Sequence, residues 1–453
     1  MKLRTAFSIA LFATLLGACS LFPVRGDREN FIRVRGTQFV YNGQPYYFAG
    51  TNLWHGCYMG STGPYGDRPR LVRELDSLAA NGLTNLRLLA ASEATPLQRS
   101  VGPPIQRAPG VLDETLLEGL DFLLAEMAER RMHAVLFLNN YWEWSGGMAQ
   151  YNVWAEGVQG VDPDDTTQGY GAFMNFAATF YANPKANALY RNYVRTIISR
   201  KNTVNGRRYS EDPTIMAWQL ANEPRPGTNG SEGEQTLPAM YRWVDETAAY
   251  IHSLDTNHLV SAGSEGTVAF RWSTDCYLRT HRTPHIDYLT FHLWPKNWGW
   301  FDPTRFEETL PVSETNALLY VQTHVALARE LRRPIVMEEF GLARDNAQVK
   351  PGSPATARDR YYARVLTALY DSARAGGPVA GSNFWAWGGE GTPAHEDGLW
   401  REGDPFLGDP PREPQGFNSI FLSDRSTLDI IRNHARAMQR LGNEDTLHAA
   451  PQP

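Results

Sequence analysis

Apolar runs of strand length alternate with amphipathic helical segments along most of the chain. Residues 113–132 show the helical period most clearly, because their leucines and methionines recur along one stripe. Runs such as 84–89 and 133–140 are short and apolar, as buried strands are. The pattern gives about eight strand–helix units, which predicts an α/β fold: a single (β/α)8 TIM barrel whose strand ends open onto one face.

The two ends of this pattern depart from the alternation. Residues 31–41 carry alternating apolar positions on either side of Gly36, which predicts an N-terminal β-hairpin on the barrel floor. No serine- and glycine-rich linker and no repeat marks a second domain. Residues 31–441 are therefore expected to form one domain with long loops at the C-terminal face of the strands, and residues 442–453 a disordered tail.

The N-terminal residues have the composition of a targeting segment. Lys2 and Arg4 precede an apolar run at 6–16, which is too short for a resident transmembrane helix. The run ends in the motif Leu-Gly-Ala-Cys at 16–19, which resembles the bacterial lipobox. We therefore expect residues 1–18 to be a lipoprotein signal peptide. The alternative is an ordinary signal peptide with a chance cysteine, and the mature protein is exported in either case.

A lipobox of this kind implies cleavage before Cys19 and lipidation of its thiol. Residues 19–30 are polar and are expected to form a tether. Ser20 follows the cysteine, and in Gram-negative cells the absence of aspartate there indicates sorting to the outer membrane. We expect a protein that is lipid-anchored to the bacterial outer membrane, on the periplasmic or the cell-surface side, and that contacts the membrane through this anchor alone.

Composition narrows the possible functions. The formal net charge of −6 and the pI near 6.0 argue against nucleic-acid binding. The chain has 13 tryptophans and 20 tyrosines, many in predicted loops, where flat rings would either stack on a ligand or pack the loops together. Whether Cys57 and Cys276 form a disulfide is left open. No cluster of cysteine and histidine and no phosphate-binding glycine loop is present in the sequence, so no metal or cofactor is expected.

Two glutamates stand at the ends of predicted buried strands. The apolar run 214–221 stops at Asn222, Glu223 and a proline, which lacks the amide that a strand ladder needs. A second run, 334–341, carries Glu339 at its end. Either residue alone would suit a structural ion pair. Because parallel strand ends share one face, the two together predict one pocket with acid/base chemistry.

Two carboxylates from different strands are the minimum set for cleaving a glycosidic bond. One must be protonated to assist the leaving oxygen, and the other ionised to attack the sugar or activate water. Arg87 would keep a carboxylate ionised, and Asn222 would hold a sugar hydroxyl. Glu338 precedes Glu339 and is expected to point to the opposite side of its strand, in a structural role.

Several motifs resemble glycoside hydrolase family 5, and within it the β-mannanase and β-mannosidase branch. They span the chain from about residue 30 to 440, and the long match that ends in Asn-Glu-Pro is the most specific. The segments that carry the resemblance are 139–142 (NNYW), 145–151 (SGGMAQY), 214–224 (TIMAWQLANEP), 292–294 (HLW) and 338–341 (EEFG). Segments 294–302, 219–227 and 403–411 are similar to the exo-acting mannosidase members, which are also exported lipoproteins.

This resemblance implies a role for each site residue. Glu223 would be the general acid/base and Glu339 the nucleophile of a retaining enzyme, with carboxyl groups about 5–5.5 Å apart. Arg87 would hold the nucleophile, and Asn222 would contact the sugar 2-hydroxyl. His292 would sit beside the carboxylate pair, and Trp385 would form the platform under the sugar at the cleavage point.

One position departs from most of the family. Where most relatives carry a tyrosine that bonds the nucleophile, this chain has Trp294, as the exo-like members do, which leaves open how Glu339 is held. Trp54 and Trp142 directly follow strand ends and are expected to form subsite walls. Other loop tryptophans are further candidates for such walls or for loop packing, namely Trp144, Trp298 and Trp300.

The expected function is retaining hydrolysis of β-1,4-mannosidic bonds in mannan or mannooligosaccharides, with the exo mode favoured because loops would block one end of the groove. An endo-β-1,4-mannanase with the same mechanism is the alternative. A β-glucanase is disfavoured by the 145–151 motif, and an inactive carbohydrate-binding envelope protein by the two intact glutamates. The enzyme is expected to be a monomer.

Overall fold

The structure is a computed structural model that describes residues 30–448, with side chains up to residue 442. The predicted signal peptide at 1–18, Cys19 and the tether up to residue 29 lie outside the described residues, so these remain predictions. No helix within the described part of the chain combines the length and the apolar character that crossing a membrane requires.

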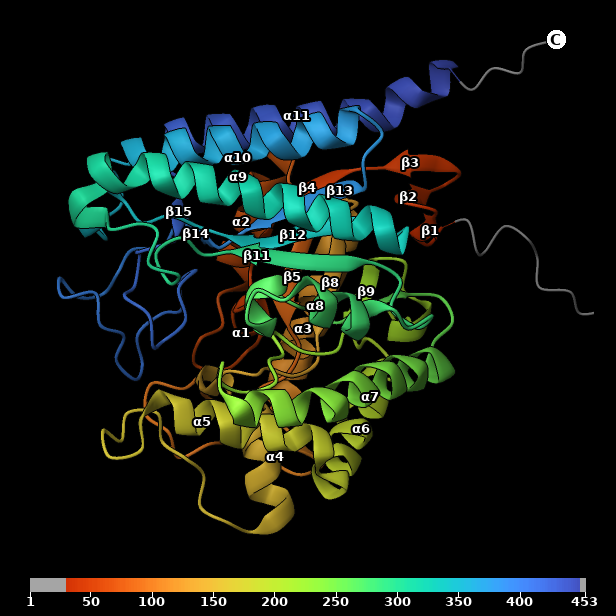
Figure 1. The fold of residues 1–453 in the computed structure, drawn as a ribbon, viewed down its shortest axis with the longest axis vertical. Helices are drawn as coiled ribbons and strands as arrows, with labels where there is room; N and C mark the ends of the chain where they lie inside the picture. Colours follow the sequence, from red (N-terminus) through yellow and green to blue (C-terminus); the bar gives the residue numbers. More distant parts are fainter. Residues whose placement is uncertain (1–29, 449–453) are drawn as a thin grey trace, which may run out of the picture.

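Eight parallel strands form the barrel that the sequence predicts (Figure 1). They are β4 (Phe48–Asn52), β5 (Asn85–Leu89), β8 (His133–Phe137), β9 (Ile215–Gln219), β10 (Leu259–Ser261), β11 (Leu289–Leu293), β12 (Ile335–Phe340) and β13 (Val379–Phe384). Their order in the sheet is β10-β9-β8-β5-β4-β13-β12-β11. Two backbone hydrogen bonds close the ring between β10 and β11, from Asp287 N to Val260 O at 2.8 Å and from His292 N to Glu265 O at 3.1 Å.

A helix follows each barrel strand and covers its outer side. These helices are α2 (Arg68–Ala80), α3 (Glu114–Glu129), α6 (Pro184–Ile198), α7 (Ser231–Leu254), α8 (Thr274–His281), α9 (Phe306–Leu331), α10 (Thr356–Arg374) and α11 (Arg425–His448). Figure 1 shows α9, α10 and α11 along one side of the barrel and α6 and α7 along the opposite side. The amphipathic period of the sequence therefore corresponds to helices that bury one face against the sheet.

The remaining elements lie in the connections. The additional helices are α1 (Gly56–Gly60), α4 (Gly147–Glu156) and α5 (Gly169–Ala178), with 3-10 turns at Glu143–Ser145, Thr179–Ala182, Tyr209–Glu211, Thr267–Phe270, Pro303–Arg305 and Asp345–Ala347. Two short ribbons, β6 (Gln106–Ala108) with β7 (Val111–Leu112) and β14 (Trp387–Gly389) with β15 (Ile420–Phe421), stiffen long loops. Cys57 and Cys276 are both free thiols.

A three-stranded antiparallel sheet closes the barrel floor. The expected hairpin gains a third strand, giving β1 (Arg33–Arg35), β2 (Gln38–Tyr41) and β3 (Gln44–Tyr46). Phe39 from this sheet meets Tyr288 edge-on, with ring centroids 5.3 Å apart, and packs with Phe48 of the barrel. Figure 1 shows this sheet at the end of the barrel opposite to the long loop between β14 and β15.

The last helix continues beyond its predicted end. The sequence predicts that the helix ends at Leu441 and that a disordered tail follows, whereas α11 continues to His448. A Cβ atom on Gly442 would lie 2.7 Å from the carbonyl oxygen of Pro45, so a side chain would collide with β3. The glycine permits close helix–sheet contact and does not mark a helix end. The expected tail over residues 442–453 is thus helical as far as residue 448, and residues 449–453 lie outside the described part.

Candidate active site

Glu223 and Glu339 meet at the C-terminal face of the barrel. Glu223 follows β9 and adopts a left-handed backbone with φ of +49°, which costs a non-glycine residue on the order of 1–2 kcal/mol. Its amide donates to the carbonyl of Gly263 at 2.9 Å, which fixes this turn. One oxygen of each glutamate and one nitrogen of His292 all lie within 4.8 Å of one another. That spacing fits a retaining glycosidase, whose carboxyl groups lie about 5–5.5 Å apart, and is too short for an inverting one.

Arg87 on β5 is the cation at the centre of the site. Its side chain is fully buried and donates to Glu339 Oε1 at 2.5 Å. The same guanidinium donates to Asn222 Oδ1 at 2.7 Å, to Gln219 Oε1 at 2.8 Å and to Asn52 Oδ1 at 3.1 Å. Arg87 therefore ties four barrel strand ends to the position of one carboxylate, as its predicted role requires.

Asn222 is held rigidly at the floor of the cavity. While its side-chain oxygen accepts from Arg87, its amide nitrogen donates to Asn140 Oδ1 at 3.1 Å. Asn140 Oδ1 also accepts from the backbone amide of Trp142 at 3.1 Å. The loop after β8 is thereby fixed to the same network that places the carboxylates.

Glu338 does not point away from Glu339, which corrects the expectation from strand alternation. The pairing of β11 with β12 passes from Phe291 opposite Met337 to His292 opposite Glu339, so Glu338 is an extra residue in a β-bulge. Its carboxylate lies 3.6 Å from Arg87 Nε and accepts from Gln219 Nε2 at 2.6 Å, inside the barrel.

His292 bridges the two catalytic candidates. Its Nδ1 lies 2.6 Å from Glu223 Oε1 and 3.3 Å from Glu339 Oε2. Burial opposes the charged ring, but the carboxylates of Glu339 and Glu223 outweigh it and raise the pKa of His292 to about 10. Burial likewise opposes the charged form of Glu223, yet the hydrogen bond from His292 lowers the pKa of Glu223 to about 2. In the empty site the shared proton thus resides on the ring.

An indole N–H is directed at each carboxylate. Trp142 Nε1 donates to Glu223 Oε2 at 2.5 Å, and Trp294 Nε1 donates to Glu339 Oε2 at 3.2 Å. Trp294 thus supplies by its indole the contact for which most relatives use a tyrosine hydroxyl. Trp385 is buried beside it, with ring centroids 6.2 Å apart and planes at 77°, and forms one wall of the cavity.

The carboxylates open into a cavity of about 670 Å³ at the centre of the loop face. Predicted residues in its lining are Trp142, Trp144, Asn222, Glu223, Trp294, Trp298, Glu339 and Trp385. Arg87 and His292 lie beneath this surface and act on it through the carboxylates. Trp300 lies outside the cavity, against a neighbouring groove.

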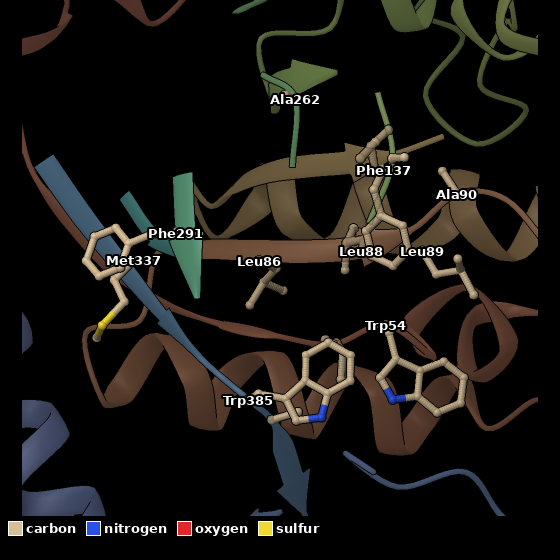
Figure 2. Packing of buried hydrophobic residues seen from close by; sticks show 14 of the residues in the cluster. Trp54, Leu86, Leu88, Leu89, Ala90, Phe137, Ala262, Phe291, Met337 and Trp385 are labelled. Atoms are coloured by element: carbon tan, nitrogen blue, oxygen red, sulfur yellow. The ribbon is translucent and has the colours of Figure 1, made fainter. Parts of the chain in front are cut away.

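Trp54 is not a subsite wall, which corrects the prediction made from its place after a strand. Figure 2 draws it among buried apolar side chains, and the ring is fully inaccessible. Its indole N–H donates to the carbonyl of Gly408 at 2.8 Å, and its ring meets Trp144 and Phe406 edge-on. The residue anchors the long loop between β14 and β15. Its side-chain direction depends on the turn after β4, which residue types alone do not reveal.

Sequence reasoning missed several charged residues of the cavity. Arg225 stacks over the ring of Trp142 at 5.1 Å and pairs with Glu265, which follows β10. Burial raises the pKa of Glu265 to about 7 and that of Glu413 to about 8. Glu265 could have been predicted from the sequence, because it follows a strand. The Arg412–Glu413 segment lies in the long loop before β15 and carried no such signal.

Glu223, His292 and Glu339 form the group within residues 30–448 that resembles a metal site by spacing. The carboxylate oxygens of the two glutamates, however, already receive hydrogen bonds from Arg87, Trp142 and Trp294. A cationic and N–H donor set of this kind stabilises anions, so the chemistry of the site does not fit a bound cation.

Comparisons with known proteins agree with this geometry. The family model described as GH family 5 beta-mannosidase-like matches residues 29–443. Mannan endo-1,4-beta-mannosidase 1 of Oryza sativa subsp. japonica is 30% identical over 437 residues, which cover 92% of this chain and 88% of that protein. The glycoside hydrolase family 5 mannosidase from Rhizomucor miehei superposes with a TM-score of 0.84 at 35% identity, covering 92% of this chain and 99% of that one. The endo-1,4-beta-mannanase of the same fungus, at 23% identity and a TM-score of 0.64 over 90% of this chain and 99% of its own, shares the fold. The chain therefore belongs to glycoside hydrolase family 5, in its β-mannosidase-like branch, and is a glycoside hydrolase.

Proposed function

We propose that the enzyme removes mannose from the non-reducing ends of β-1,4-mannan chains with retention of configuration. The observation that carries the retaining mechanism is the carboxylate pair, whose oxygens lie within 4.8 Å of each other. Mannan as the substrate is supported by the rice relative, which is a mannan endo-1,4-beta-mannosidase, and the Rhizomucor miehei relative, which is a mannosidase, supports a mannoside in general.

The first chemical step breaks the bond to the leaving sugar. Glu339, oriented by Arg87 and Trp294, attacks the anomeric carbon and forms a glycosyl ester. The glycosidic C–O bond breaks as Glu223 gives its proton to the leaving oxygen. Water then attacks the same carbon after Glu223, now ionised, removes its proton, and Glu339 is released. Two inversions at one carbon leave the configuration unchanged.

His292 lies 2.6 Å from Glu223 and passes a proton to it when the glycosidic bond breaks. In the empty site the negative charge of Glu339 is the largest of the interactions that hold the proton on the ring. Attack on the sugar consumes that charge, so the pKa of His292 falls as the leaving oxygen becomes basic. The proton then moves through Glu223 to the leaving group.

The exo mode is supported by ion pairs that close one end of the cavity. Arg412, from the loop between β14 and β15, lies 3.0 Å from Glu143 Oε1 and 2.6 Å from Asp164 Oδ2, both in the loop after β8. It also donates to the carbonyl of Gln98, after β5, at 3.1 Å. The side chains of Arg412 and Glu143 are 10% and 4% exposed, so this pair is stronger than a surface pair, whereas Asp164 is 47% exposed and adds less. These contacts hold together the loops that follow β13, β5 and β8, and the three loops cover the ends of these strands and of β4.

Glu223 follows β9 and lies at the edge of this closure, because Trp142, which donates to it, directly precedes Glu143. The acid must stand beside the leaving oxygen, so the departing chain extends on the Glu223 side, over β9 and β10. The sugar that is cleaved off occupies the closed side, over Trp385 on the β13 end. A closed sugar side admits a chain end and excludes the middle of a chain, which is the structural requirement for exo action.

The alternative is an endo-mannanase with the same two glutamates. It is favoured by the rice relative, which is a mannan endo-1,4-beta-mannosidase. The ion pairs of Arg412 weigh against it in this chain, because an endo enzyme needs a groove that is open at both ends.

Trp294→Phe should lower kcat/KM on p-nitrophenyl β-mannoside by about 10- to 100-fold, because a hydrogen bond to a charged group contributes about 1.5–3 kcal/mol. Trp294→Tyr offers a hydroxyl in its place and should recover part of the loss. Trp154→Phe, a change in a half-buried tryptophan of α4 outside the cavity, is the matched control. Full activity in Trp294→Phe would show that the indole N–H does not hold the nucleophile.

His292→Gln should move the alkaline limb of the kcat/KM profile to lower pH by more than one unit. With the ring present, the shared proton is retained up to the raised pKa of about 10 and is lost only above it. Without the ring, Glu223 must hold the proton alone and releases it at lower pH. His285→Gln, at a half-buried histidine far from the cavity lining, is the control. An alkaline limb at the same pH in both variants would rule out proton storage on His292.

Products from mannohexaose labelled at the reducing end would distinguish the two modes. The wild type should release mannose and labelled mannopentaose first. Arg412→Ala breaks the closure and should add mannobiose to mannotetraose among the early products, while Arg73→Ala, which breaks the exposed pair with Glu390, should not.

Early mannobiose to mannotetraose from the wild type would contradict the exo mode. Cleavage of cellohexaose in place of mannohexaose would contradict mannan as the substrate and leave the two-glutamate mechanism intact.

A further inference from the structure

A cluster of indoles stands at the rim of the cavity, outside the catalytic groups. Trp272, Trp298 and Trp300 have ring centroids 5.0–5.6 Å from one another, and we call them the tryptophan shelf. Trp298 and Trp300 are half-buried and pack against Tyr320 of α9. Trp272 is 46% exposed and is the most exposed tryptophan in residues 30–448. Loop packing explains the positions of Trp298 and Trp300, but it does not explain why Trp272 is exposed.

The shelf borders a second, open groove of about 640 Å³. Threonine and asparagine side chains alternate with the rings there, and the lining includes Trp300, Asn316, Leu319 and Thr323. Trp272 and Trp298 line both this groove and the catalytic cavity. The two spaces therefore meet at these two rings, and a chain that leaves the cavity on this side would pass over them.

The local backbone turns Trp272 outward. Arg271 and Trp272 are consecutive left-handed residues with φ of +58° and +64°, each at a cost on the order of 1–2 kcal/mol. The Trp272 amide donates to the carbonyl of Thr267 at 2.8 Å, and Ser273 then caps α8. A tryptophan that such a turn directs outward contributes little to the core. An indole with this degree of exposure on a fixed turn is typical of a binding surface.

The shelf lies on the side where the leaving chain emerges. Trp272 follows β10, and Trp298 follows β11. The loop after β5 helps to close the cavity, and β5 is four strands from β11 around the eight-stranded ring. Arg225 and Asn229, which follow Glu223 in the chain, and Asn297, which precedes Trp298, line the same cavity. Polar side chains that suit sugar hydroxyls thus lead from Glu223 to the rings.

We propose that the tryptophan shelf binds the part of a β-1,4-mannan chain that lies beyond the sugar next to the cleaved bond, on the reducing-end side. Pyranose rings present a C–H face that packs on indole, and their hydroxyls suit the threonine and asparagine side chains of the groove. The shelf gives the enzyme a preference for long chains over mannobiose. This inference rests on the proposed function, since it names the same substrate.

The test measures affinity in the Glu339→Gln background, which removes the nucleophile and leaves the cavity in place. Isothermal titration with mannobiose and mannohexaose gives the ratio of the two dissociation constants. Trp272→Ala should weaken mannohexaose binding by about tenfold, equal to about 1.4 kcal/mol, and reduce that ratio accordingly. Trp300→Ala, which lines only the outer groove, should act in the same direction. Trp272→Tyr keeps a flat ring and should retain most of the preference even if the alanine variant folds poorly.

Trp154→Ala, at a half-buried tryptophan of α4 outside both spaces, is the control and should leave the ratio unchanged. An unchanged ratio in the shelf variants would overturn the inference. Equal weakening of both ligands would also overturn it, because the rings would then belong to the subsites next to the cleaved bond. A parent that binds cellohexaose and not mannohexaose would instead overturn the proposed function, and with it mannan as the ligand of the shelf.

Discussion

The buried guanidinium of Arg87 is the group on which the catalytic face depends. It carries a full charge inside the barrel and is compensated by Glu339, with Glu338 at 3.6 Å and amide oxygens from neighbouring strands. Breaking a buried pair by removing one partner costs about 3–5 kcal/mol, because the other charge is left unpaired. The geometry of the nucleophile is therefore coupled to the closure of the barrel itself, and a shift of one strand would move the site.

Around this pair the loops divide the face into two functional sides. The ion pairs of Arg412 close the side where the terminal sugar would sit, and the exposed indoles of Trp272 and its neighbours lie on the other side. The acid Glu223 stands between the two, with its proton stored on His292. An exo enzyme that holds on to long chains needs this asymmetry: a closed pocket for one sugar and an open surface for the remainder.

Much of this arrangement followed from the sequence, because strand ends in a parallel barrel converge whatever the loops do. That rule places Glu223, Glu339 and His292 correctly, whereas Arg87 lies in the middle of β5 and reaches Glu339 with its long side chain. It fails for Glu338, where a β-bulge shifts the alternation, and for Trp54, whose ring turns into the core. The cavity closure was out of reach because its ion pairs join segments that are hundreds of residues apart, such as Glu143 and Arg412. The local pattern of apolar residues predicts where strands end, whereas contacts between loops that are distant in sequence are visible only in the folded structure.

The central claim is that Glu339 forms a covalent bond with the sugar while Glu223 carries the proton. Mass spectrometry of the enzyme after incubation with 2-deoxy-2-fluoro-β-mannosyl fluoride tests it most directly, because the fluorine slows release of the glycosyl ester. The account predicts a single fluoromannosyl adduct on the peptide that contains Glu339. An adduct on a different residue, or no adduct together with inverted product configuration by NMR, would contradict it.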